Sequence, residues 1–346
     1  MNSNIHPFRI GKQTISSNVF FAPINPGLAR DGEIGEEYID FFIKHSGVDI
    51  GICYVGNVAL NSISRSNTNT AILLSNQMPL WNELTSQIRE RYSLPAIQLA
   101  WKPKSMIMQK EFTQMDIESQ IKLFKEFYNN FRSEKIIIDD FREKIKLSKK
   151  CGFSIVQIHA AHGYGLSLLL SSATNPSSPA KSKGMLIIKE LIKCIKDEGM
   201  ISDIRISLYE GISPEDIELS YKIELVSEFQ KIGVDILSLS NGIYNVNKNH
   251  IYPPKSDRKT ILSESIQIAS KNKNIIVNTA GNMEFALMSS NTFPSNLTFS
   301  LGRQLLADAK TIEKIKTGDF KSIRYCSECN ECHYYSNSTP SLQLCR

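Results

Sequence analysis

Eight short apolar segments alternate with helix-like segments along the chain, and this alternation constrains the fold more than any other feature. Amphipathic stretches lie between most of them, for example residues 79–92, 185–198, 214–232 and 263–272. Strict alternation of strands and helices is typical of a parallel sheet covered by helices. Eight units within 346 residues favour an α/β fold of the closed (β/α)8 TIM barrel type over an open doubly wound sheet. The predicted strands are residues 18–22, 50–55, 96–99, 155–159, 203–208, 236–240, 275–278 and 297–301.

Local signals agree with this division. Gly152, Gly199 and Gly233 stand where predicted helices should end, because glycine adopts the left-handed conformation that often follows a helix. Pro214, with Ser213 before it and acidic residues after it, is a strong helix start. No Gly-x-Gly-x-x-Gly motif follows the first predicted strand, which argues against a Rossmann domain.

One connection is longer than a minimal barrel needs. More than fifty residues, from Trp101 to Ser154, separate the third predicted strand from the fourth. Residues 121–131 and 139–150 look helical, and residues 132–135 form a polar link between them. We therefore expect an elaborated connection after the third strand. The expected division is a barrel over residues 1–320 and a short cysteine-rich tail over residues 321–346.

The charge pattern excludes several classes of function. The 40 basic and 35 acidic residues are scattered, so they predict a solvated surface and no nucleic-acid groove. No apolar run has transmembrane length, and the first residues do not resemble a signal peptide. We expect a cytoplasmic protein that binds neither nucleic acid nor membrane. The oligomeric state is open, with a homo-oligomer among the alternatives.

Acid–base residues gather at the end of the fourth predicted strand. The apolar run that begins at Val156 ends in His159, His162 and Tyr164, and a glycine follows each of the last two. Barrel enzymes present their chemistry at the carboxyl ends of the strands, and these residue types suit general acid–base work. A metal site or satisfied core histidines are the alternatives. The sequence disfavours a metal, since no carboxylate or third histidine lies nearby.

The cysteines form two groups. Cys53, Cys151 and Cys194 are isolated in apolar surroundings and are expected to be buried. The other four crowd the tail, and without a secretory signal such a cluster points to a metal and not to disulfides. An iron–sulfur cluster, a zinc ion and a metal-free tail are all compatible with it, and the short spacing favours iron. The candidate ligands are Cys326, Cys329, Cys332 and Cys345.

Six motifs in order resemble the old yellow enzyme family of flavin-dependent ene-reductases, near its 2,4-dienoyl-CoA and 2-enoate reductase branch. The fourth-strand motif, Gln157-Ile158-His159-Ala160-Ala161-His162-Gly163-Tyr164, is the most specific. The others are Phe21-Ala22-Pro23-Ile24-Asn25, Gln98-Leu99, Ser171-Ser172-Ala173-Thr174-Asn175, Ile204-Arg205-Ile206-Ser207 and Ser300-Leu301-Gly302-Arg303.

The resemblance implies a bound FMN at the carboxyl-terminal end of the barrel. Arg205 would face the polar edge of the flavin, where negative charge develops on reduction. Glycines and an arginine near the last two strands would hold the phosphate, as barrels commonly do. The implied FMN-binding residues are Ala22, Pro23, Ile24, Gln98, Arg205, Gly281, Gly302 and Arg303.

The resemblance also implies reduction of an activated alkene, such as an enone or an enoyl thioester. His159 and His162 would bind the carbonyl oxygen of this small molecule, and Tyr164 would donate a proton. NAD(P)H would supply hydride. The tail would carry a 4Fe-4S cluster, with zinc as the alternative. Because the chain ends at Arg346, we expect no nicotinamide-binding domain of its own, and a ferredoxin-like donor becomes the alternative reductant.

The chain departs from the family pattern after Asn175, where the usual arginines, acidic residue and Tyr-Gly-Gly are replaced by a Ser/Pro/Lys-rich stretch. This departure leaves two alternatives to an ene-reductase. One is an electron-transfer flavoprotein that has lost its substrate loop. The other is a non-catalytic barrel with a zinc-binding tail.

Overall fold

Eight parallel strands close into a barrel in the order β10-β3-β4-β5-β6-β7-β8-β9. The computed structural model describes residues 4–11, 13–103, 115–175, 177–244, 246, 251 and 261–332. Each of the eight predicted strands overlaps one strand of the barrel, so the (β/α)8 prediction is confirmed. The strands are β3 (Val19–Ile24), β4 (Ile52–Ala59), β5 (Leu94–Ala100), β6 (Ile155–Ala160), β7 (Ile201–Ser207), β8 (Ile236–Ser240), β9 (Ile276–Ala280) and β10 (Leu297–Leu301).

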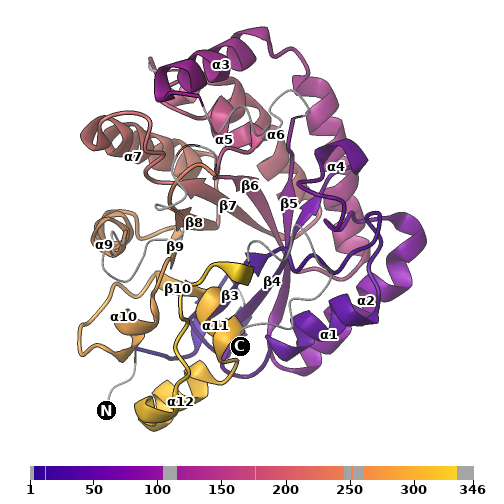
Figure 1. Cartoon of the computed structure of the whole chain (residues 1–346), viewed down its shortest axis with the longest axis vertical. Coiled ribbons are helices and arrows are strands. Elements are labelled where there is room, and N and C mark those ends of the chain that lie inside the picture. Colours follow the sequence, from indigo (N-terminus) through magenta and orange to yellow (C-terminus); the bar gives the residue numbers. More distant parts are fainter. Residues whose placement is uncertain are drawn as a thin grey trace.

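Helices surround the barrel (Figure 1). Gly152, Gly199 and Gly233 have positive φ directly after three of these helices, as predicted. No helix in the described ranges is long and apolar enough to cross a membrane. The helices are α1 (Glu36–Lys44), α2 (Met78–Glu90), α3 (Ile117–Asn130), α4 (Glu134–Lys150), α5 (Gly165–Leu169), α6 (Lys183–Asp197), α7 (Glu215–Lys231), α9 (Leu262–Lys271), α10 (Glu284–Met288), α11 (Arg303–Ala307) and α12 (Thr311–Thr317).

The long connection after β5 contains two helices, α3 and α4, as expected. Asp116 caps α3, because its side chain accepts a hydrogen bond from the backbone N–H of Ser119 at 2.8 Å. The predicted polar link at 132–135 is too long, since α4 already begins at Glu134. The reason is that Ile137 packs into the core and extends the apolar face of α4 toward its start.

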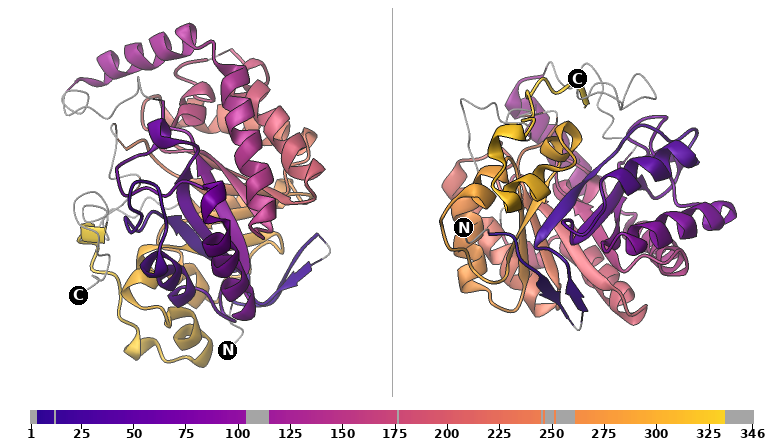
Figure 2. Two further views of the ribbon diagram at one scale, coloured as in Figure 1. Left: turned by 90° about the vertical axis from the view of Figure 1, so that its right-hand side faces the viewer. Right: turned by 90° about the horizontal axis from the view of Figure 1, so that it is seen from below.

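A hairpin of β1 (Phe8–Ile10) and β2 (Gln13–Ile15) closes the amino-terminal end of the barrel. Phe8, Ile10 and Ile15 pack against apolar residues from the first turns of the barrel strands. Figure 2 shows this hairpin and the last described residues of the tail at opposite ends of the barrel. The amino-terminal end is therefore sealed by apolar side chains.

The barrel interior changes character along β6, β7 and β8. Alternate residues of a strand point to the same side, so every second residue faces the interior. The first layer is apolar and the next two are polar. We call them the floor layer (Ile155, Ile201, Ile236), the middle layer (Gln157, Asp203, Ser238) and the rim layer (His159, Arg205, Ser240).

Candidate functional site

The rim layer brings the predicted acid–base residues together. The rings of His159 and His162 lie 5.6 Å apart between centroids, and the ring of Tyr164 lies 4.2 Å from that of His159. Arg205 lies opposite His159 in the register of β6 and β7. Arg205 of β7 thus joins three neighbouring residues of the β6 motif at the carboxyl-terminal end of the barrel, the end at which barrels carry their sites.

His162 is held by contacts to both of its ring nitrogens. Nε2 lies 3.0 Å from the Ser240 hydroxyl, and Nδ1 lies 3.3 Å from the carbonyl oxygen of Gly242. Arg205 donates to the same Ser240 hydroxyl at 3.1 Å. A neutral imidazole has a single N–H, which in this arrangement serves the Gly242 carbonyl while Nε2 accepts from Ser240. His162 therefore orders the rim here, and its role as a substrate donor stays a prediction.

His159 differs from His162 in its hydrogen bonding. It is buried at the end of β6, and within the described residues its Nδ1 has no hydrogen-bond partner. Buried polar groups are nearly always satisfied, so an unpaired nitrogen in a polar rim is suited to a ligand. Of the two histidines, His159 is the one whose ring remains available.

Tyr164 directly precedes α5 and reaches across to β4. Its hydroxyl accepts a hydrogen bond of 2.9 Å from the side-chain amide of Asn57. The backbone around it is tightly packed, because a Cβ at Gly165 would lie 2.3 Å from the Trp101 ring. Trp101 is therefore a packed aromatic that supports the tyrosine loop.

Burial sets the protonation states of these three side chains. It lowers the pKa of His159 and of His162 well below the usual range, and the charge of Arg205 acts in the same direction. Burial raises the pKa of Tyr164 well above its usual value. Near neutral pH the two imidazoles are therefore uncharged, and the tyrosine keeps its proton.

The predicted flavin residues at the ends of β3 and β10 also lie side by side. A Cβ placed on Gly302 would lie 3.4 Å from Ile24 and 3.7 Å from Ala22, and Pro23 stands half-buried between these two. The surface there is apolar, as a flavin ring requires. This arrangement fits the implied FMN.

The ends of β9 and β10 fit a phosphate. Gly281 has φ +108° and open space where a side chain would be, and the neighbouring Asn282 has a buried amide nitrogen with no partner in the described part of the chain. Arg303 begins α11 on the adjacent strand end. Donors and a cation around open space suit an anion.

Gln98, one of the predicted FMN-binding residues, is anchored by a residue of the middle layer. Its side-chain amide nitrogen donates to the Gln157 carbonyl oxygen at 2.6 Å, and the residue is buried. Gln157 belongs to the middle layer, so the orientation of Gln98 depends on residues beneath the site.

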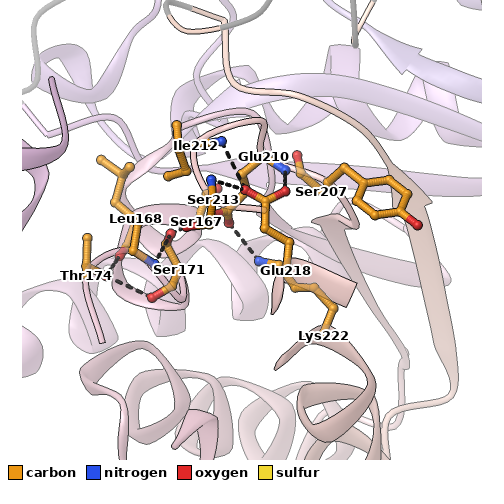
Figure 3. Close-up of polar contacts among 12 residues, drawn as sticks. Ser167, Leu168, Ser171, Thr174, Ser207, Glu210, Ile212, Ser213, Glu218 and Lys222 are labelled. Atoms are coloured by element: carbon orange, nitrogen blue, oxygen red, sulfur yellow. Dashed lines mark hydrogen bonds and ion pairs between the residues drawn. The ribbon is translucent and has the colours of Figure 1, made fainter. Parts of the chain in front are cut away.

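A buried charge cluster fixes the loop that follows β7 (Figure 3). The Lys222 ammonium lies 2.7 Å from one oxygen of Glu210, and the Ser171 hydroxyl donates to the other. Glu218 accepts four backbone N–H groups of residues 210–213, at 2.7 to 3.2 Å. Segment 171–175, which directly precedes the departure from the family pattern, is thereby tied to the β7 loop and α7.

The described part of the cysteine-rich tail contacts α11 through Cys326 and Asn330. The backbone N–H of Cys326 donates to Gln304, and Asn330 accepts from Arg303 at 2.8 Å. The N–H of Glu328 donates to the Cys326 sulfur at 3.4 Å. Cys329 is exposed, and Cys332 is half-buried. Among the described residues no three His, Cys, Asp or Glu side chains gather around one point, and the predicted ligand Cys345 lies outside them.

Sequence reasoning missed three residues of this region. Asn57 and Ser240 are polar residues within or at the end of strands, and nothing in their local sequence indicates contacts with Tyr164 and Arg205. Asp203 could have been found, because it lies two residues before Arg205 on a strand and must share its face.

Comparison with known proteins gives a consistent picture. The family model described as NADH:flavin oxidoreductase / NADH oxidase matches residues 5–321. The cinnamate reductase of Clostridium sporogenes is 24% identical over 379 residues, covering 94% of this chain and 54% of the relative. The NADPH dehydrogenase of Bacillus velezensis is 22% identical, covering 87% of this chain and 90% of the relative. The chain thus spans about half the length of the cinnamate reductase.

The barrel is also found in solved structures. The old yellow enzyme of Pichia sp. AKU4542 superposes with a TM-score of 0.68 at 13% identity, covering 92% of this chain and 87% of that one. At such low identity the likeness shows the fold alone.

Proposed function

The chain belongs to the NADH:flavin oxidoreductase / NADH oxidase family, and from that premise we propose that it is an FMN-dependent oxidoreductase that reduces activated C=C bonds. One observation carries the proposal. Neutral His159, whose Nδ1 has no hydrogen-bond partner among the described residues, and protonated Tyr164 meet beside Arg205 at the carboxyl-terminal rim. A hydrogen-bond donor, a proton donor and a cation are the groups that this chemistry requires.

The FMN would be held by residues from several strands. When bound, FMN supplies the hydride. The apolar residues Ala22, Pro23 and Ile24 would support the ring, and Gln98 and Arg205 would contact its polar edge. Gly281, Gly302 and Arg303 would hold the phosphate. Two observations support this assignment: Gly302 lies close to the end of β3, and the Asn282 amide nitrogen has no partner in the described part of the chain.

The protein's own side chains would act on the alkene substrate. His159 would donate a hydrogen bond to its carbonyl oxygen, where negative charge develops as hydride reaches the β-carbon. Tyr164 would pass its hydroxyl proton to the α-carbon and recover one from solvent. The alkene thereby gains one hydride and one proton. The Asn57 amide, at 2.9 Å, would stabilise the tyrosine oxygen while its proton is away.

The electron donor and the tail are separate proposals. We propose NAD(P)H as the reductant, which the family description and the names of the relatives support, and a ferredoxin-like protein as the alternative. We also propose that residues 321–346 form a metal-binding tail beside a barrel of residues 1–320. The 4Fe-4S cluster is preferred to zinc. The cysteine spacing and the N–H bond to the Cys326 sulfur support it, and iron, sulfide and zinc analysis tests it.

A flavin reconstitution tests the main proposal. The purified protein should take up one FMN and turn yellow, and NADPH or NADH should bleach it without oxygen. His159→Ala should weaken binding of a phenol, used as a probe of the carbonyl-oxygen site, more than His162→Ala, since within the described residues both ring nitrogens of His162 have partners and Nδ1 of His159 has none. Both variants should keep their FMN. A colourless protein that takes up no FMN would refute the proposal.

A further inference from the structure

The middle layer of the barrel is an unusual element. Barrel interiors are filled mainly by bulky branched side chains. Here a continuous hydrogen-bonded network spans the interior between the floor layer and the rim layer, and its single carboxyl group is Asp203. The network comprises Tyr54, Gln98, Gln157, Asp203, Ser238, Asn278 and Ser300.

Asp203 is fully buried, and its two oxygens differ. Oδ2 accepts three hydrogen bonds: from the Tyr54 hydroxyl at 2.6 Å, the Gln157 amide at 2.5 Å and the Ser238 hydroxyl at 3.0 Å. Oδ1 is buried without a hydrogen-bond partner within the described residues. Three donors stabilise a carboxylate, while burial and the unpaired oxygen oppose it. Asp203 is thus balanced between its charged and neutral forms, and burial raises its pKa to about 7.

The charges around Asp203 are few. Tyr54 on β4 is titratable, but its pKa is raised well above the usual value, so it stays protonated. Gln157 and Ser238, from β6 and β8, are uncharged. In the rim layer above it lie the uncharged His159 and the cationic Arg205. Below it lies the apolar floor layer. Arg205 is therefore the only nearby cation in the described interior that Asp203 can offset.

Two short links connect Asp203 to the predicted flavin contacts. In one, the Gln98 amide donates a hydrogen bond to Gln157, and the Gln157 amide donates one to Asp203. The other is electrostatic, since Asp203 lies two residues before Arg205 on the same face of β7. When Asp203 is ionised, it offsets the positive charge of Arg205. When it is protonated, this offset is lost, and the positive potential above the rim rises.

We propose that Asp203 is a positioning residue that sets the charge beneath the flavin and couples flavin reduction to uptake of a proton from solvent. The inference rests on the proposed function. Hydride from NAD(P)H would bring two electrons and one proton to a bound flavin, which would gain one net negative charge. The Asp203 carboxylate would then bind one proton from water and become a neutral carboxylic acid, so that negative charge beneath the ring falls as that on the ring rises.

The reduction potential of the FMN-loaded protein between pH 5.5 and 9 tests this inference. Wild type and Asp203→Asn should coincide at pH 5.5, where Asp203 is neutral. At pH 8.5 Asp203→Asn should favour reduced flavin by about tenfold or more, which is about 30 mV for a two-electron couple. Asp235→Asn is the matched control. This substitution removes the same charge from a partly exposed residue that pairs with Lys196. The reduction potential of this variant should follow that of the wild type at every pH.

Two further measurements keep the inference falsifiable. Tyr54→Phe removes one donor to the carboxylate, so it should move the bend in the potential–pH curve to higher pH. In flavin-free protein, an infrared carboxylic-acid band should titrate near neutral pH and be missing from Asp203→Asn. If the potentials of FMN-loaded wild type and Asp203→Asn run parallel at every pH, or if the infrared band is missing, the role of Asp203 is overturned. The proposed function would not be affected by either result. A protein that takes up no FMN overturns both proposals.

Discussion

The two ends of β6, β7 and β8 are built from opposite kinds of side chain. The floor layer consists of three isoleucines sealed by the β1–β2 hairpin, whereas the rim layer carries His159, Arg205 and Ser240. The change takes only four residues along each strand. It indicates that the amino-terminal end supplies stability and the carboxyl-terminal end supplies chemistry, with the Asp203 network between them.

The largest effect is expected at the rim. Tyr164→Phe removes the proton donor but keeps the ring that packs on His159. Reoxidation of the reduced flavin by an alkene should slow by about 10²–10⁴-fold, the usual contribution of general acid catalysis. Stopped-flow absorbance measures this rate, and FMN content and melting temperature should not change. Tyr92→Phe, at an exposed tyrosine, is the control. If the Tyr164→Phe protein were reoxidised by the alkene at the wild-type rate, the assignment of Tyr164 as the proton donor would be contradicted.

The buried pair of Glu210 and Lys222 tests whether the carboxyl-terminal end also contributes stability. Lys222→Met leaves the fully buried Glu210 without its cation. The free energy of unfolding in urea should fall by about 3–5 kcal/mol. The double variant Glu210→Gln/Lys222→Met should recover most of the loss. Lys193→Met, which breaks an exposed pair with Asp197, is the control and should have no measurable effect. Equal losses in the single and double variants would mean that packing dominates over charge.

The floor layer should affect stability alone. Ile155→Ala leaves a cavity beneath the middle layer and should cost roughly 2–5 kcal/mol of unfolding free energy. The dissociation constant of FMN should stay within a factor of two to three of the wild type, about the size of a surface effect. A large loss of FMN affinity would show that the floor and the site are not independent.

The middle layer should make stability depend on pH. The pKa of Asp203 is raised by burial to about 7 in the folded protein, against about 3.9 in an unfolded chain. The folded state therefore binds a proton at Asp203 more tightly than the unfolded state does. The stability that this proton contributes is present at low pH and is lost as the pH rises through 7. Relative to Asp203→Asn, the wild type should lose roughly 2–3 kcal/mol between pH 5 and pH 8. Urea titrations at several pH values measure this difference, and its absence would mean that Asp203 does not titrate there.

Much of this architecture could be predicted from the sequence, because strands and helices depend on local patterns. Apolar runs located all eight barrel strands, and glycine located three helix ends. His159 and Arg205 could be placed at the rim because each stands at the end of an apolar run. The β1–β2 hairpin was not predicted, since its strands are only three residues long.

Contacts between distant residues could not be predicted. Asn57 meets Tyr164 across 107 positions, and Ser240 meets His162 across 78. Such pairs depend on barrel closure and strand register, which no local pattern encodes. The same reason explains why the two histidines looked equivalent in the sequence. Only the folded chain distinguishes His162, held by Ser240 and Gly242, from His159, whose Nδ1 has no partner among the described residues.

The most direct test of the central claim is one anaerobic titration. FMN-loaded protein is reduced with dithionite and mixed with cyclohexenone, cinnamaldehyde or an enoyl thioester, and the flavin absorbance is followed. We predict that at least one of these alkenes restores the oxidised spectrum, with one alkene reduced per flavin. A flavin that stays reduced with all three, yet is reoxidised by oxygen, would contradict the assignment of this site to C=C reduction.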